Sequence, residues 1–188
     1  MKRTILVIVL LVTMKGTAQF IKERAIDLSV GYGFSTSTYD SDNAIDHSFY
    51  LQGEYAFIIT KYLDLRPYIG IILTEVNGKD IDGYPTIYKS TTNAIVTGGK
   101  TRLTIPVPFT SWLSTYLEIG IGASWGRFEN FTPNDNIKKN GVIMHVPATI
   151  GFIFGKKRKF NFAPTFYFHN SIKQSSAGLL FGINFPIN

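Results

Sequence analysis

Cysteine is absent from this chain of 188 residues. No disulfide can therefore stabilise the fold, and no thiolate can bind a metal or act as a nucleophile. Acidic residues are also few, with 13 Asp and Glu against 19 Lys and Arg, which gives a formal net charge of +6. Three of the basic residues, Lys2, Arg3 and Lys15, lie within residues 1–18, so residues 19–188 carry 6 − 3 = +3. So small an excess of positive charge does not indicate a nucleic-acid partner.

Long apolar runs are lacking as well, apart from one at the start of the chain. Ile5–Met14 is almost unbroken, but it is shorter than the about 20 residues that a membrane-spanning helix needs. Lys2 and Arg3 precede it, and Gly16-Thr17-Ala18 follows it with small residues at the positions that signal peptidase reads. This order predicts a secretory signal peptide over residues 1–18 and one domain over residues 19–188. The alternative is a buried N-terminal helix.

Helical periodicity does not occur after residue 18, and a two-residue alternation takes its place. In the stretch AIDLSVGYGFS, residues 25–35, bulky apolar residues alternate with small or polar ones, which is typical of a strand with two different faces. The pattern recurs and predicts eight strands, each longer than the five or six residues usual in soluble sheets. These are residues 25–35, 48–59, 64–75, 92–105, 113–126, 142–154, 160–169 and 177–187.

The connections between these segments alternate between long and short. Polar connections of 7 to 16 residues are predicted at 36–47, 76–91, 127–141 and 170–176, and tight ones at 60–63, 106–112 and 155–159. This rhythm, together with an even number of strands, is typical of an up-and-down membrane barrel with both termini on one side.

The two faces of each segment indicate which side meets lipid. In residues 113–126, Leu117, Ile119 and Trp125 share one face, whereas Glu118 and several glycines share the other. The interior of an eight-stranded barrel is only just wide enough for side chains, so the large apolar residues of eight strands would overfill it. We therefore predict an inverted arrangement with lipid outside and a polar, packed lumen. A soluble exported lipid-binding barrel, with apolar faces turned inward, is the alternative.

The segments YLDLRPYIGIIL (residues 62–73) and YLEIGIGASWG (residues 116–126) resemble strands of the small eight-stranded outer-membrane β-barrel proteins of Gram-negative bacteria. The resemblance implies an all-β, eight-stranded antiparallel up-and-down transmembrane barrel in the outer membrane, without a cofactor and as a monomer. It also implies three partners: outer-membrane lipids, lipopolysaccharide and the barrel assembly machinery. That machinery reads an aromatic residue near the C-terminus, for which Phe185 is the candidate.

Six charged residues fall on the predicted lumen face: Asp27, Glu54, Arg66, Lys100, Arg102 and Glu118. A turn centred on Thr110 would place Arg102 directly opposite Glu118, and a turn centred near Lys61 would place Glu54 diagonal to Arg66. Buried charges need partners, so we predict a network of ion pairs that fills the lumen. A narrow gated pore that uses these charges for ion selectivity is the alternative.

The sequence FHNS offers one catalytic hypothesis. His169 and Ser171 lie two residues apart, so on a strand both would face the lumen or its rim. The pair resembles part of the His-x-Ser motif of the outer-membrane lipid A deacylases, which implies His169 as general base and Ser171 as nucleophile. Ile172 stands where that family has Asn, and residues 172–188 contain no acid to orient the histidine.

The remaining features favour a function outside catalysis. His47, His145 and His169 are dispersed without ligand spacing, so no metal site is predicted. The predicted loop 76–91 is the most apolar one and contains Tyr84, Ile87 and Tyr88 as candidate contact residues. The sequence thus predicts a non-enzymatic outer-membrane barrel with a structural role or a role in surface contact through its outer loops.

Overall fold

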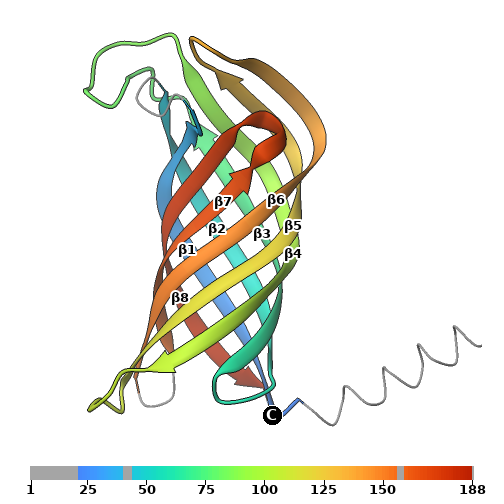
Figure 1. Ribbon diagram of the computed structural model, residues 1–188, viewed down its shortest axis with the longest axis vertical. Coiled ribbons are helices and arrows are strands. Elements are labelled where there is room, and N and C mark those ends of the chain that lie inside the picture. Colours follow the sequence, from blue (N-terminus) through green and yellow to red (C-terminus); the bar gives the residue numbers. More distant parts are fainter. Residues whose placement is uncertain (1–20, 40–43, 156–158, 188) are drawn as a thin grey trace, which may run out of the picture.

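The computed structural model describes residues 21–39, 44–155 and 159–187 and contains a closed barrel of eight antiparallel strands (Figure 1). The strands are β1 (Glu23–Ser37), β2 (Ile45–Ile58), β3 (Leu63–Glu75), β4 (Lys89–Pro106), β5 (Leu113–Phe131), β6 (Asn136–Phe154), β7 (Phe160–His169) and β8 (Gln174–Ile187). A three-residue 3-10 helix, η1 (Asn170–Ile172), joins β7 to β8. The predicted fold class is confirmed. The predicted signal peptide, residues 1–18, lies outside the described residues.

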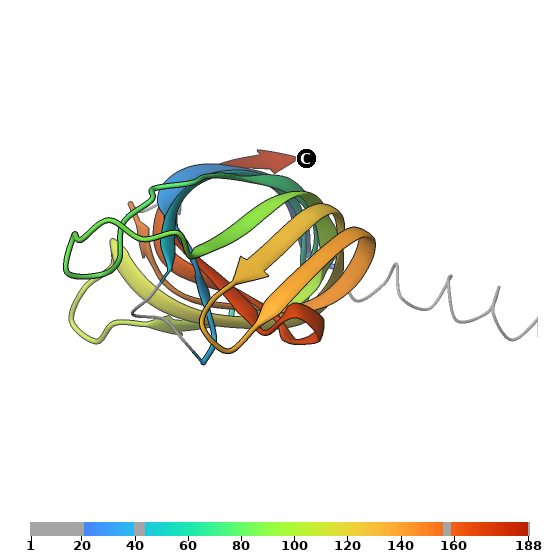
Figure 2. The same cartoon turned by 90° about the horizontal axis from the view of Figure 1, so that it is seen from above.

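Each strand pairs with its neighbours in the chain, and β1 closes the barrel by pairing with β8 as well as with β2. Figure 2 shows the resulting ring from above. The connections 59–62 and 107–112 lie at the same end of the barrel as the C-terminus, which we call the turn end (Figure 1). The connections 76–88 and 132–135 and the helix η1 lie at the opposite end, which we call the loop end. The described residues contain no helix of the length and hydropathy needed to span a bilayer.

The side chains point as the alternation predicts. On β5, Ile119 and Trp125 are each 65% exposed, whereas Tyr116 and Glu118 are 2% and 4% exposed. The same division holds on the other strands, so Leu, Ile and Phe cover the outer surface of the barrel. The alternative of a barrel with its apolar faces inward is therefore wrong.

Two predicted loops are shorter than expected because the strands continue into them. The segment 127–141 is almost entirely strand, since β5 reaches Phe131, β6 starts at Asn136, and only residues 132–135 connect them. The segment 170–176 likewise consists of η1 followed by the first residues of β8. In both places the outer face of the strand is mostly polar, with Phe131 as an exception, and this hid the apolar alternation. That outer face lies beyond the apolar belt of the barrel, so it needs no large hydrophobic residues.

Candidate functional site

The lumen contains a layer of seven buried charged side chains, which we call the charged layer. Its members are Asp27 from β1, Glu54 from β2, Asp64 and Arg66 from β3, Lys100 and Arg102 from β4, and Glu118 from β5. Six of them were predicted for the lumen face, and the structure brings all six together. Asp64 was not singled out, although it stands two residues before Arg66 and therefore shares its face.

The ion pairs of the charged layer follow from the strand register. Arg102 pairs directly with Glu118 across β4 and β5, and its Nε lies 2.5 Å from Glu118 Oε1. Arg66 is diagonal to Glu54, and its Nη1 donates to Glu54 Oε2 at 2.8 Å. Lys100 Nζ donates to Glu118 Oε2 at 2.8 Å and also to Glu54. The two turn centres inferred from the sequence thus place these cations beside their carboxylates.

Contacts of Asp27 and Asp64 complete the charged layer. Arg66 Nη1 donates to Asp27 Oδ2 at 3.2 Å, and Asn161 Nδ2 donates to both carboxylate oxygens of Asp27, at 2.8 and 3.0 Å. Arg66 Nη2 reaches Asp64 Oδ2 at 3.3 Å. Every charge in the layer therefore has a partner of opposite sign, as a buried charge requires if desolvation is to be offset.

The charged layer leaves almost no free space. The cavity within it has a volume of about 10 Å³, which is at or below the space that one water molecule needs. A wider cavity of about 750 Å³ lies on its turn-end side, where Asp64, Arg66 and Arg102 contribute to the lining. The lumen is thus open to solvent at the turn end and filled from the charged layer onward.

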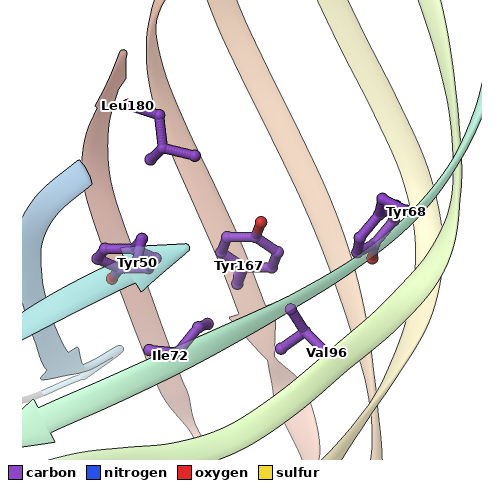
Figure 3. Packing of buried hydrophobic residues seen from close by; sticks show 6 residues of the cluster. All are labelled: Tyr50, Tyr68, Ile72, Val96, Tyr167 and Leu180. Carbon is purple, nitrogen blue, oxygen red and sulfur yellow. The ribbon is translucent and has the colours of Figure 1, made fainter. Parts of the chain in front are cut away.

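A second layer, which we call the aromatic layer, follows the charged layer toward the loop end. It consists of Tyr50, Tyr68, Ile72, Val96, Tyr167 and Leu180, which point into the lumen from five strands (Figure 3). The phenol groups have buried partners: Tyr167 donates to Gln52, and Tyr50 donates to the carbonyl oxygen of Ala177 at 3.1 Å. Aromatic rings whose hydroxyls are satisfied in this way fill the cross-section without leaving an unpaired polar group.

Two buried histidines, His145 and His169, follow the aromatic layer toward the loop end. Ser124 Oγ lies 2.7 Å from His145 Nδ1 and 3.0 Å from His169 Nε2, and the other nitrogen of His145 bonds to Tyr68. Nearer the loop end, Ile172 of η1 is fully buried and packs with apolar side chains of β4, β5 and β6. The helix η1 therefore covers this end of the lumen.

The catalytic hypothesis for His169 and Ser171 is not supported by their positions. His169 is the last residue of β7 and is fully buried, whereas Ser171 lies in η1 and is exposed. The two-residue alternation stops where the strand ends, so the two side chains do not share a face. The serine next to His169 is Ser124 on β5, which is itself fully buried.

The other predicted positions are distributed as follows. Tyr84 and Ile87 are 68% and 77% exposed in the connection 76–88, whereas Tyr88 is partly buried against Phe131, with ring centroids 5.6 Å apart. Among the described residues, no group of three or more His, Asp and Glu side chains is arranged to hold a metal ion.

No family model matches the chain, and no curated protein matches it in sequence. Solved structures do resemble it. Neisserial surface protein A (NspA) superposes with a TM-score of 0.56 at 9% identity, over 86% of this chain and 96% of that one. The N-terminal β-barrel domain of Pseudomonas aeruginosa OprF superposes with a TM-score of 0.50 at 13% identity, over 87% of this chain and 97% of that one.

This chain has the fold of the small eight-stranded outer-membrane β-barrels. At such low identity the likeness concerns the fold and carries no residue roles. Within this outer-membrane barrel fold, the features particular to the chain are the filled lumen and the exposed surface at its loop end.

Proposed function

We propose that the protein is a closed, non-enzymatic outer-membrane barrel that presents its loop end at the cell surface for contact with other molecules. The observation that carries the proposal is the filled lumen, in which the charged layer, the aromatic layer and η1 follow one another along the barrel axis. Passage of ions or solutes would require the displacement of buried ion pairs, which is costly. The exposed Tyr84 and Ile87 supply apolar contact area beyond the lipid belt.

The closed state has a direct electrical test. Purified protein inserted into planar lipid bilayers is expected to give no unitary current steps above the leak of the lipid alone, because no open path crosses the charged layer. Insertion is checked on the same sample by the shift in gel mobility between unheated and heated protein. Reproducible unitary steps between a closed and an open current level, seen only with inserted protein, would favour the gated-pore alternative.

The placement of the loop end can be tested with single cysteines, because the chain has none of its own. Ile87→Cys is expected to react with a membrane-impermeant maleimide on intact cells, since Ile87 is exposed at the loop end. Lys61→Cys, at an exposed position of the turn end, is the matched control and is expected to react only after the cells are lysed. Labelling in the reverse order would invert the proposed orientation, and no labelling of either variant before lysis would contradict surface exposure.

A further inference from the structure

The apolar outer surface of β4, β5 and β6 stops at a single row of paired residues. The last apolar row consists of Ile95, Trp125 and Val142, which pair side by side and are 43%, 65% and 64% exposed. The next outward-facing row toward the loop end consists of Asn93, Arg127 and Asn140, which pair in the same order and are all exposed. We call this second row the polar row. Apolar surface thus gives way to polar surface at the same level on three adjacent strands.

The polar row lies at the depth of lipid headgroups. Adjacent outward-facing residues of one strand are about 6–7 Å apart along the strand, so Arg127 lies just beyond Trp125. Tryptophan is enriched where the hydrocarbon meets the headgroups of a membrane. With the loop end at the cell surface, the side chain of Arg127 therefore meets the headgroups of the outer leaflet.

Arg127 forms no ion pair with any residue that the structure describes. Glu129, the next outward-facing residue of β5, is already paired, since Lys89 Nζ lies 3.1 Å and Lys138 Nζ 3.9 Å from its Oε1. A planar guanidinium without a carboxylate partner presents two parallel donors, which match the oxygens of a phosphate. Its positive charge is thus left for an external anion.

The neighbours of Arg127 supply uncharged hydrogen-bonding groups. Asn93 Oδ1 accepts a hydrogen bond from the backbone N–H of Thr74 at 2.9 Å, which fixes the amide and leaves its N–H groups as donors. Asn140 lies on the other side of Arg127, at the spacing of about 5 Å between paired residues. These side chains border a groove of about 400 Å³ on the outer face of the barrel, to which Thr91, Glu129 and Lys138 also contribute.

We propose that the polar row is a binding site for the phosphorylated sugar headgroup of an outer-leaflet glycolipid, of the lipid A type. Arg127 binds the phosphate, and the amides of Asn93 and Asn140 bind sugar hydroxyls, while the acyl chains lie on the apolar row below. A lipid fits this site because the polar row directly follows the apolar row of Ile95, Trp125 and Val142 on the same three strands. The inference rests on the outer-membrane placement proposed above, and it assigns a specific site to the lipopolysaccharide contact expected from the sequence.

Trp125 is a natural reporter for this site because it lies one row below Arg127. The chain has only two tryptophans, so Trp112→Phe leaves Trp125 as the single one. The protein, folded in neutral detergent micelles, is titrated with bisphosphorylated lipid A while the fluorescence of Trp125 is followed. Arg127→Ala is expected to weaken binding about tenfold, the loss of one charge-assisted interaction. Arg127→Lys is expected to retain part of the affinity.

Three controls decide the interpretation. Arg24→Ala, at an exposed position at the turn end of β1, is expected to bind like the parent protein. Dephosphorylated lipid A with the same acyl chains is expected to bind about as weakly to the parent as lipid A binds to Arg127→Ala. Inorganic phosphate at the same phosphate concentration is expected to leave the fluorescence unchanged.

Equal affinities of the parent protein for lipid A and for dephosphorylated lipid A would overturn the site. Equal affinities of Arg127→Ala and the parent for lipid A would overturn it as well. A response to inorganic phosphate as strong as that to lipid A would overturn the assignment to a glycolipid. The cysteine labelling and the bilayer recordings described above do not involve Arg127. A failure of the site is therefore distinguishable from a failure of the proposed function. If the labelling shows that the loop end is not at the cell surface, both proposals fall.

Discussion

Arg102→Met is expected to lower the free energy of unfolding of the barrel by about 3–5 kcal/mol, the range observed when one partner of a buried ion pair is removed. Arg102 is 3% exposed. Its Cζ lies 3.9 Å from the centroid of the Tyr116 ring, and its Nε lies 2.5 Å from Glu118 Oε1. Without it, the four carboxylates of the charged layer face only two cations, Arg66 and Lys100. Equilibrium unfolding by urea in lipid vesicles, followed by tryptophan fluorescence, measures the change.

Two further variants separate the loss of the ion pair from the loss of an arginine. Arg24→Met removes an exposed arginine from the same barrel and is expected to change stability by less than about 0.5 kcal/mol. The double variant Arg102→Met/Glu118→Gln is expected to lose less than the sum of the two single variants, because it leaves no carboxylate without its partner. If Arg102→Met unfolded like Arg24→Met, the ion pairs of Arg102 in the charged layer would not contribute to the stability of the barrel.

The charged layer could be predicted from the sequence because the geometry of a barrel is highly constrained. A two-residue period assigns each side chain to one face, and the centre of a tight turn fixes the register of its hairpin. The pairing of Arg102 with Glu118 needed only the assumption that Thr110 is the centre of the turn, and the observed register agrees. Strand count, chain topology and the outward apolar faces followed from the same periodicity.

Features that depend on several strands at once could not be predicted in this way. Ser124, His145 and His169 come from β5, β6 and β7, and their contact depends on how three strands are staggered across the lumen. The strand ends were missed for a different reason: beyond the lipid belt the outer faces of β5 and β6 are mostly polar, so the apolar alternation that identifies a membrane strand disappears. The expectation that Ser171 shares a face with His169 was wrong because β7 ends at His169, and the two-residue alternation does not continue into η1.

Gly122→Val is expected to destabilise the barrel by about 3 kcal/mol, the upper end of the usual cost of overpacking. Gly122 of β5 faces the lumen of the barrel, directly beside the hydroxyl of Tyr68. A Cβ atom at this position would lie 2.5 Å from His145 Nε2 and 2.5 Å from the backbone oxygen of Thr97, and would also overlap the oxygen of Tyr68. The tyrosine could retreat only by breaking its hydrogen bond with His145. Urea unfolding in vesicles, as for Arg102, gives the change.

Gly99→Val is the matched control, because it makes the same substitution on the neighbouring strand but on the outer face. Gly99 is exposed on β4, and no atom lies within 4 Å of the position that its Cβ would take. The added side chain meets only lipid there, and valine favours the extended backbone, so stability is expected to stay equal or to rise slightly. A loss of similar size at both glycines would mean that the cost comes from the backbone. A loss confined to Gly122 would show that the lumen is packed too tightly to admit the isopropyl group of valine, as expected for a barrel that does not conduct.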